Sequence, residues 1–401
     1  MKVLLLENIH PTAIALFKKN GFSQIEIIKG SISEKELINK ISDVSVLGIR
    51  SKTQITKKVL DQANNLLAIG AFCIGTNQID TKAATEKGIA VFNSPFSNTR
   101  SVAELVIGLC ISLLRRIPEK NNAAHKGIWL KESDGCYELR GKTLGIIGYG
   151  HIGSQVSILA ESMGMKIIYF DVNNKLALGN AESCKSLDTL LKKSDVITLH
   201  IPGNNETRNL INAQNIKKMK KGVHLINLSR GDVLDLIAVK NAIKAKQISG
   251  LAVDVFPEEP KTNKDVFKSP LQHLPNTILT PHIGGSTLEA QEAIGIDVAE
   301  KLITFSKSGS SLGCLTIPEI NLPYLKKTYR ILHIHQNVPG VLSEINGVIS
   351  QMKVNILGQY LQTNNNIGYV ALDIDKKSSL QLMRELQNVK YTIRTHNLNW
   401  Q

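Results

Sequence analysis

The stretch GKTLGIIGYGHIGSQVSILAESMGMKIIYFD, residues 141–171, decides the fold. Its run TLGIIG is typical of a buried strand, and the pattern G-x-G-x-x-G follows at Gly148, Gly150 and Gly153. The first glycine permits a tight turn, the second lets the backbone approach a pyrophosphate, and the third lets a helix pack closely on the strand. A turn with a purely structural role is the alternative. The strand before the glycines and the helix after them favour a dinucleotide-binding site.

Asp171 ends the next expected strand, KIIYFD, about 20 residues after the glycines. A carboxylate at this place can accept hydrogen bonds from the hydroxyls of an adenosine ribose, and it would repel a 2′-phosphate. The sequence therefore predicts NAD as the cofactor in preference to NADP. The expected helix that begins at His151 and Ile152 would direct its first amides at the phosphates.

Short apolar strands alternate with amphipathic helices on both sides of this stretch. Strands are expected at 2–7, 24–30, 44–51, 66–73 and 90–95, and then at 143–148, 166–171, 195–201, 224–229, 250–256 and 277–281. Expected helices between and after them include 33–42, 80–88, 100–116 and 286–305. Alternation of this kind indicates an α/β protein whose parallel sheets are covered by helices on both faces.

The C-terminal part follows a different order. The segment 306–327, SKSGSSLGCLTIPEINLPYLKK, is rich in Ser, Gly and Pro and is predicted to loosen into a linker. After it we expect a strand, a helix, two strands, a helix and a strand, at 329–335, 339–350, 353–363, 368–375, 379–388 and 391–397. The order β-α-β-β-α-β is that of a ferredoxin-like domain. Its small size favours a role in regulation or assembly.

Composition narrows the class of protein. A chain of 401 residues is expected to form two or three domains, and 42% hydrophobic with 20% charged residues is ordinary for a globular protein. No segment approaches the roughly 20 apolar residues that span a bilayer, and the N-terminus is expected to be a strand rather than a signal peptide. Five scattered cysteines favour reduced thiols in the cytoplasm over disulfides or zinc. The net charge of +14 is mostly lysine on expected helix faces, so we do not predict a nucleic-acid partner.

Three residues near expected strand ends could carry chemistry. Arg230 follows the strand 224–229, and its planar guanidinium suits a carboxylate. His282 follows the strand 277–281 and suits proton transfer near neutral pH. Glu259, in the turn VFPEEP, could hydrogen-bond His282 and favour its imidazolium form. Each also has a structural alternative: a buried histidine, an arginine that caps a strand, or a solvated carboxylate.

The motifs GYGHIG, NLSRGDVLD, VDVFPEEP and LTPHIGGS together resemble the D-isomer-specific 2-hydroxyacid dehydrogenase family, in order and in spacing. The resemblance implies that Arg230 binds the substrate carboxylate, His282 is the acid/base and Glu259 is its partner. It implies a Rossmann-type NAD domain at 98–285, inserted in a flavodoxin-like substrate domain at 1–97 and 286–312. A linker at 313–327 and a C-terminal domain at 328–401 would follow. The implied cofactor contacts are Gly148, Gly150, His151, Ile152, Gly153, Asp171, Leu228, Ser229, Arg230, Asp254, His282, Ile283, Gly284 and Gly285.

Within that family, LGIRSKTQIT, IGAFCIGTNQID and FNSPFSNTRSVAELV are similar to members that oxidise D-3-phosphoglycerate to 3-phosphohydroxypyruvate. The similarity implies a substrate site whose members are Arg50, Ser51, Ile74, Gly75, Asn98, Lys131 and Arg230. Arg50 and Lys131 suit a phosphate, and the amides of the loop 73–77 would face the carboxylate. Taken alone, Arg50 could also be a solvated strand end. Reduction of 2-oxoglutarate is expected as a side activity.

The C-terminal segment resembles ACT domains, which bind amino acids at their interfaces. The resemblance implies that L-serine is an inhibitor bound by His335, Asn337 and Asn355, and that the protein is a homotetramer. His333 and His335 could form a metal pair, but no further ligands accompany them, so no metal is predicted. Two other functions stay open: a dehydrogenase of another hydroxy acid, such as erythronate phosphate or glyoxylate, and a non-catalytic NAD-sensing regulator.

Overall fold

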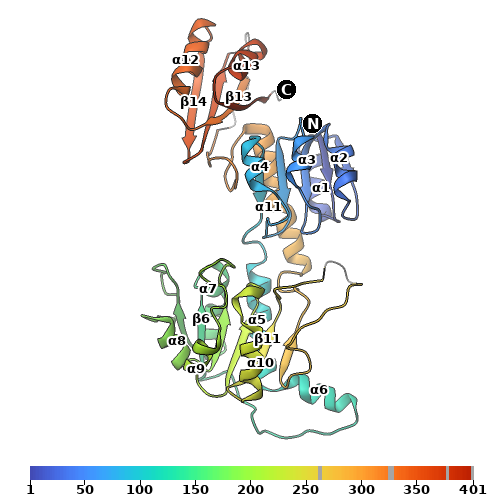
Figure 1. Cartoon of the computed structure of the whole chain (residues 1–401), viewed down its shortest axis with the longest axis vertical. Coiled ribbons are helices and arrows are strands. Elements are labelled where there is room, and N and C mark those ends of the chain that lie inside the picture. Colours follow the sequence, from blue (N-terminus) through green and yellow to red (C-terminus); the bar gives the residue numbers. More distant parts are fainter. Residues whose placement is uncertain (261–263, 324–328, 376–378, 399–401) are drawn as a thin grey trace. The chain divides into compact units, whose positions relative to one another are not determined.

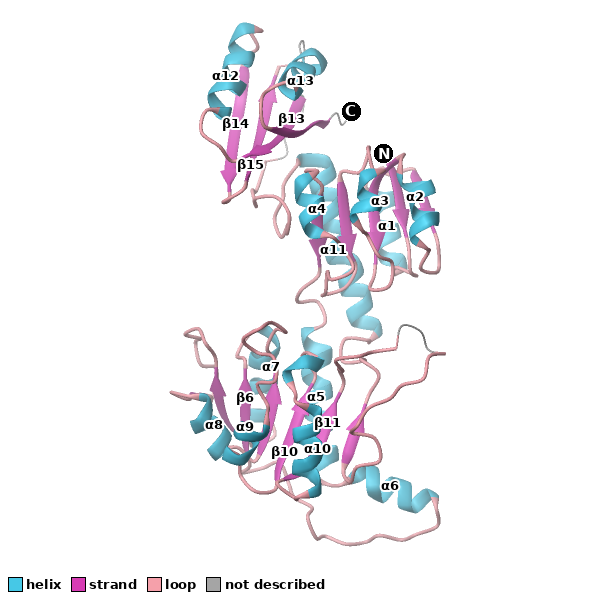
Figure 2. Ribbon diagram, in the orientation of Figure 1, coloured by secondary structure: helices cyan, strands magenta, loops and turns pink. Residues whose placement is uncertain are grey.

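The computed structural model describes residues 1–260, 264–323, 329–375 and 379–398. Its internal contacts divide the chain into two compact units, of which one is Asn98–Ala290 and the other joins Met1–Ser97 to Gln291–Gln401. Both units contain sheets covered by helices (Figures 1 and 2). The predicted fold class, α/β with parallel sheets and a separate C-terminal domain, is confirmed.

The unit Asn98–Ala290 is built on a parallel sheet of seven described strands in the order β12-β11-β10-β9-β6-β7-β8. Their bounds are β6 Thr143–Ile147, β7 Lys166–Phe170, β8 Glu182–Ser183, β9 Val196–Leu199, β10 Val223–Asn227, β11 Ile248–Val253 and β12 Thr277–Leu279. The order turns back between β6 and β9. Ligands of such open sheets bind beyond the carboxyl ends of the strands at that reversal.

Helices cover both faces of this sheet. The buried side chains of α5 (Thr99–Leu114) and α7 (His151–Ser162) share one apolar core with β6 and β7. The second core receives α8 (Leu187–Lys193), α9 (Ala213–Lys218) and α10 (Leu236–Lys244). A short 3-10 helix, Gly231–Val233, follows β10, and α6 (Ile117–His125) leads into an extended segment. The apolar strands form a buried parallel sheet because both of their faces are covered.

The other unit has a parallel sheet in the order β2-β1-β3-β4-β5. Its strands are β1 Lys2–Leu5, β2 Gln24–Ile27, β3 Val44–Ile49, β4 Ala68–Ala71 and β5 Ala90–Asn93. The long helix α11 (Leu288–Ser308) and α1 (Pro11–Lys19) pack on one face. On the other face lie α2 (Glu34–Ile41), α3 (Lys57–Asp61) and α4 (Thr81–Glu86).

The C-terminal residues form an antiparallel sheet in the order β14-β15-β13-β16. The elements are β13 Tyr329–Gln336, α12 Val341–Gln351, β14 Ile356–Thr363, β15 Ile367–Ile374, α13 Ser379–Gln387 and β16 Thr392–Leu398. Both helices pack on one face of the sheet. The predicted β-α-β-β-α-β order is confirmed.

The segment before β13 is more ordered than its composition suggests. Helix α11 continues to Ser308, and Ser311, Ile317 and Leu322 are buried. The prediction of a loose linker is therefore wrong for residues 309–323, because apolar side chains among the Ser and Gly residues anchor this segment to the core of the unit. The remainder of the predicted linker, 324–327, lies outside the described residues.

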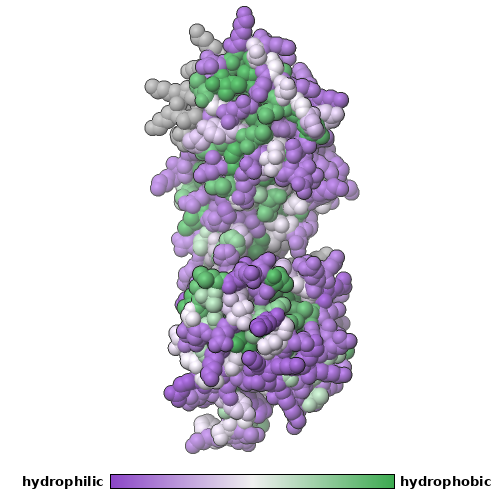
Figure 3. Space-filling model, turned by 90° about the vertical axis from the view of Figure 1, so that its left-hand side faces the viewer, coloured by the Kyte–Doolittle hydropathy of each residue, from purple (hydrophilic) through white to green (hydrophobic). Residues whose placement is uncertain are grey.

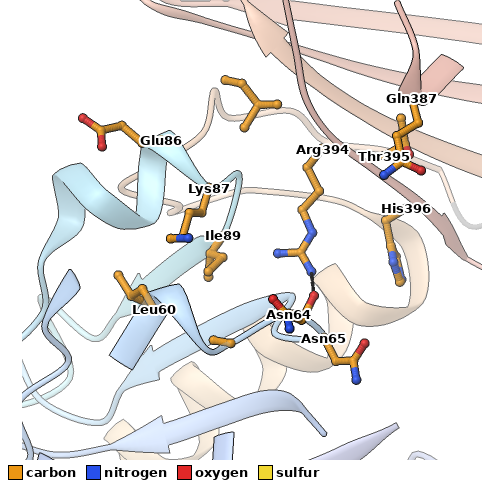
Figure 4. Close-up of a pocket in the computed structure, with 12 residues that line it drawn as sticks. Leu60, Asn64, Asn65, Glu86, Lys87, Ile89, Gln387, Arg394, Thr395 and His396 are labelled. Atoms are coloured by element: carbon orange, nitrogen blue, oxygen red, sulfur yellow. Dashed lines mark hydrogen bonds between the residues drawn. The ribbon is translucent and has the colours of Figure 1, made fainter. Parts of the chain in front are cut away.

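Strand β16 also meets the parallel sheet of the same unit. The guanidinium of Arg394 donates to the backbone oxygens of Leu66 and Asn64 at 2.6 and 3.1 Å. Figure 4 shows Arg394 reaching from β16 toward Asn64, with Lys87 and His396 lining the same cavity of about 470 Å³. These hydrogen bonds hold the edge of the C-terminal sheet against the loops near α3 and α4.

No helix in the described part of the chain is long and apolar enough to cross a membrane. Within the same residues, no three His, Cys, Asp or Glu side chains gather as a metal site would require.

Candidate active site

The residues expected to bind cofactor and substrate in the unit Asn98–Ala290 follow the carboxyl ends of five strands. The glycine loop follows β6, Asp171 follows β7, and Leu228 to Arg230 follow β10. Asp254 follows β11, and the loop 282–285 comes after β12. In a parallel sheet these ends share one edge, so the sheet gathers residues that lie far apart in the sequence.

The glycine loop has the shape that a dinucleotide requires. Gly148 adopts a φ of 91°, and a Cβ atom there would lie 2.4 Å from the carbonyl oxygen of His200. At Gly153 a Cβ would lie 2.2 Å from the Gly148 oxygen, whereas at Gly150 it would meet no atom within 4 Å. Two glycines are thus required by close packing, and Gly150 leaves open space at the start of α7. A pyrophosphate fits this cradle.

Asp171 is hydrogen-bonded to the glycine loop. Its Oδ2 accepts from the Tyr149 amide at 2.8 Å, and its Oδ1 accepts from the Asn173 amide at 2.9 Å. The half-buried carboxylate is therefore fixed in direction and still has acceptor capacity, since each oxygen carries two lone pairs.

His282 and Glu259 form a hydrogen-bonded pair, with 2.8 Å between Nδ1 and Oε2. The other carboxylate oxygen of Glu259 accepts from the Phe256 amide at 3.0 Å, which fixes the carboxylate. The bond to Glu259 raises the pKa of His282 above its usual value, against the opposing effects of burial and Arg230. Burial raises the pKa of Glu259, but its hydrogen bonds with His282 and Phe256 and the nearby charges outweigh burial and lower it. The pair therefore favours imidazolium beside carboxylate.

Asp254 holds the turn that carries His282. Its carboxylate is 1% exposed and accepts from Thr280 Oγ1 at 2.6 Å and from the amides of Ile283 and Gly284, both at 2.8 Å. His282 itself has a φ of 54°, a conformation that a side chain adopts only when its surroundings impose it. From the sequence, Asp254 was predicted only as a cofactor contact, and its hydrogen bonds to the turn were not predicted.

Asn227 fixes the backbone that carries Arg230. It is fully buried, its Nδ2 donates to the Arg230 carbonyl at 2.9 Å, and its Oδ1 accepts from the Ser229 amide and hydroxyl at 3.0 and 2.7 Å. The Arg230 side chain is exposed and donates from Nη1 to the Ser229 carbonyl at 2.7 Å. Asn227 was not predicted from the sequence, although an amide residue that ends a buried strand three residues before Arg230 was a signal for it.

The other expected substrate residues divide between the two units. Arg50 and Ser51 follow β3, and Ile74 and Gly75 follow β4, so adjacent strands of one sheet bring these four together. Asn98 belongs to the unit Asn98–Ala290, where it precedes α5. Its Nδ2 lies against Gly285, and its buried Oδ1 has no hydrogen-bond partner among the described residues.

Lys131 is not brought to the Arg230 edge of its own unit. It is exposed on the segment after α6. Further along that segment, Asp134, Gly135 and Tyr137 share a pocket with Gly222, Val223 and Ile248 at the amino ends of β10 and β11. Arg230 and His282 lie at the carboxyl ends.

Of the three residues expected to bind serine, Asn355 lies apart from His335 and Asn337 within one chain. Along the strand pairs, His335 lies opposite Gly368 and thus near Thr363, at one end of the sheet. Asn355 precedes Ile356, which pairs with Ile374 at the other end. His335 is buried, and Asn337 donates from Nδ2 to the Asn364 carbonyl at 2.7 Å. A site that combines all three needs a second copy of the domain.

Comparison with known proteins agrees with this architecture. Residues 107–284 match the NAD binding domain of D-isomer specific 2-hydroxyacid dehydrogenases, and residues 331–394 match an ACT domain like that of the AHAS small subunit. The D-lactate dehydrogenase of Aquifex aeolicus, solved with NAD and lactic acid, has a TM-score of 0.68 at 28% identity, over 79% of this chain and all of that one.

Two curated relatives match nearly the whole chain. The D-3-phosphoglycerate dehydrogenase of Dictyostelium discoideum is 50% identical over 398 residues, 99% of this chain and 97% of the relative. The enzyme of the same name from Escherichia coli K12 is 49% identical over 400 residues, with the same coverage. With its NAD-binding domain and its ACT domain, the chain belongs to the D-isomer specific 2-hydroxyacid dehydrogenase family, together with these D-3-phosphoglycerate dehydrogenases.

Proposed function

We propose that this protein oxidises D-3-phosphoglycerate to 3-phosphohydroxypyruvate with NAD, and that L-serine inhibits it. The observation that carries the proposal is the His282–Glu259 pair at 2.8 Å, on the sheet edge that also presents Arg230 and the glycine loop. The near full-length similarity to enzymes named D-3-phosphoglycerate dehydrogenase supports the choice of hydroxy acid.

The roles of the residues follow from their chemistry. The glycine loop and Asp171 would hold NAD, which would accept the hydride from C2 of the substrate. Arg230 binds the substrate carboxylate and orients the C2 hydroxyl toward His282. The neutral imidazole of His282 removes the hydroxyl proton, and the resulting imidazolium is stabilised by Glu259. In the reverse direction the imidazolium returns this proton to the carbonyl oxygen.

A side-by-side assay tests the substrate. NADH oxidation is followed with phosphohydroxypyruvate, glyoxylate and 2-oxoglutarate, and the highest kcat/KM is expected for phosphohydroxypyruvate. Slower turnover of 2-oxoglutarate is expected as a side activity. A preference for glyoxylate would instead assign the protein to another hydroxyacid dehydrogenase, and no turnover of any acid would favour the NAD-sensing regulator.

We also propose that the protein is a cytoplasmic homotetramer. The segment after α6 exposes Ile128, Trp129 and Leu130, with Trp129 84% exposed, which is more apolar surface than a monomer needs to present. Lys131 adjoins these residues, so it would reach a substrate only in the site of a second subunit. All five cysteines are unpaired, as expected for a reducing compartment. Sedimentation equilibrium at several concentrations measures the assembly.

Serine is proposed to bind where two C-terminal domains meet. The edge strand β14 exposes Leu357 and Leu361, and hydrophobic residues gather on the upper part of Figure 3, where this domain lies. Pairing of two such sheets would join His335 and Asn337 of one copy to Asn355 of the other. Inhibition then requires serine to prefer one arrangement of the oligomer, since equal affinity for both shifts nothing.

A further inference from the structure

A buried glutamine, Gln78, links the two loops that are expected to bind the substrate's anionic groups. Its side chain donates from Nε2 to the Arg50 carbonyl at 2.6 Å, in the loop after β3, and to the Gly75 carbonyl at 3.3 Å, in the loop after β4. Gln78 is 7% exposed, so water does not compete for these bonds.

These two bonds help to determine where the neighbouring amides point, together with the Cys73 thiol, which lies 3.6 and 3.1 Å from the same two carbonyl oxygens. In a trans peptide group the N–H and the C=O point in opposite directions. When the carbonyls of Arg50 and Gly75 face inward to Gln78, the amides of Ser51 and Thr76 face the other way. Neither amide donates to another described group. Outward N–H groups of two adjacent loops present partial positive charge on the same side, which favours an anion there.

Two further side chains hold these loops in place through hydrogen bonds. Asn93, at the end of β5, donates from Nδ2 to the Ile74 carbonyl at 2.6 Å, which turns the Gly75 amide outward by the same rule. Glu7, at the end of β1, accepts from the amides of Lys52 and Thr53 at 3.0 and 2.7 Å. At Gly75 an added Cβ would meet no atom within 4 Å, so space remains in front of the loop.

The backbone around Gln78 does not depend on its side chain. The Gln78 carbonyl accepts from the Ile55 amide at 2.7 Å, and Ile55 and Ile79 form a parallel bridge. Both would persist after a substitution that keeps the size of the side chain. The Nε2 group therefore acts on the loop carbonyls rather than on the local fold.

We propose that Gln78 is a positioning residue for substrate binding: it turns the amides of Ser51 and Thr76 toward the substrate and keeps the Arg50 loop in register with the 73–77 loop. This inference rests on the proposed function, since it concerns the same substrate site. A group that holds an anion equally in the ground state and the transition state contributes to KM and little to kcat. The predicted signature is thus a change in KM.

The experiment compares Gln78→Met, which keeps the length of the side chain and removes its donor, with Gln54→Met. Gln54 is a matched control because it also donates from Nε2 to a loop carbonyl, that of Lys52 at 3.2 Å, but it is exposed. For Gln78→Met we expect KM for phosphohydroxypyruvate to rise roughly 10-fold or more and kcat to fall less than about threefold. The Kd for NADH and the Tm should stay near the wild-type values, and Gln54→Met should behave as wild type.

An unchanged KM in a folded Gln78→Met protein, or an equal rise in KM for Gln54→Met, would overturn the proposal. If Gln78→Met fails to fold, Gln78→Glu retains a polar side chain of the same length, and the same rise in KM is required of it. If the wild type prefers another 2-oxo acid, the proposed substrate is wrong. The KM of Gln78→Met for that preferred acid then decides the role of Gln78.

Discussion

The Nδ1 atom of His282 lies 2.8 Å from Oε2 of Glu259, and the amides of Ile283 and Gly284 next to this histidine are held by the buried carboxylate of Asp254. Glu259 thus favours the charged form of the imidazole, and Asp254 fixes the position of the turn that carries it. The division matters because the two can be perturbed separately.

Glu259→Gln should shift the pH dependence of both the oxidation and the reduction reaction to lower pH. The bond to Glu259 is the largest cause of the raised pKa of His282, so its loss lowers that pKa. Reduction needs imidazolium and is lost as pH rises through the pKa of His282, whereas oxidation needs neutral imidazole and is gained over the same range. The measurement is kcat/KM against pH in each direction. Profiles that coincide with those of the wild type would make Glu259 merely structural.

Asp171→Ala should weaken NADH binding and narrow the preference for NADH over NADPH. The substitution removes both the acceptor for the ribose hydroxyls and the charge that repels a 2′-phosphate. It also removes acceptors from the Tyr149 and Asn173 amides, so some loss with both cofactors is expected. The ratio of kcat/KM for NADH to kcat/KM for NADPH separates the loss of cofactor preference from the general loss of binding. A ratio equal to that of the wild type would contradict the role of Asp171 in selecting NAD.

Arg50→Ala should lower kcat/KM for phosphohydroxypyruvate roughly 10–100-fold, the effect of losing one charge-assisted hydrogen bond of about 1.5–3 kcal/mol. Hydroxypyruvate lacks the phosphate, so kcat/KM for hydroxypyruvate should hardly change. The backbone carbonyl of Arg50 keeps its bond to Gln78 in this variant, so the loop itself should persist. Equal losses with both substrates would show that Arg50 supports the loop and not the phosphate.

Asn337→Ala should retain dehydrogenase activity and raise the serine concentration needed for half inhibition. A coupling of about 1–3 kcal/mol between the serine site and the active site is typical of such regulation. The variant also loses the bond from Nδ2 to the Asn364 carbonyl, so its Tm is compared with that of the wild type. Inhibition of Asn337→Ala at the wild-type serine concentration would place the sensor elsewhere.

Asp373→Asn should destabilise the protein strongly. Arg330 donates from Nε and Nη2 to the two oxygens of Asp373 at 2.6 and 2.7 Å, and both side chains are buried. Neutralising one partner leaves a buried charge without its counterion, which costs about 3–5 kcal/mol in comparable pairs. Urea denaturation measures the cost. The exposed pair Arg140–Glu138 is the control, since Glu138→Gln should have little effect.

The sequence by itself determined most of the helices and strands and named the candidate residues of the site. The hydrophobic pattern and the glycine spacing at 141–171 were enough to predict the strand, the turn, the helix and the acidic residue, because each of these depends on local geometry and on a steric rule. Arg230, Glu259 and His282 could be named because their motifs follow strands whose carboxyl ends must share one edge.

Only the tertiary structure decided what holds these residues in place. Gln78, Asn93, Asp254 and Asn227 act through hydrogen bonds to backbone groups of other loops, and no local pattern encodes a partner that lies across a sheet. The same reason explains the segment 309–323, whose Ser and Gly residues indicate a linker while its buried Ile317 and Leu322 anchor it. Whether His335 and Asn355 can meet depends on strand order and register, which place them at opposite ends of one sheet. Register is a property of paired strands, so a single strand's sequence does not contain it.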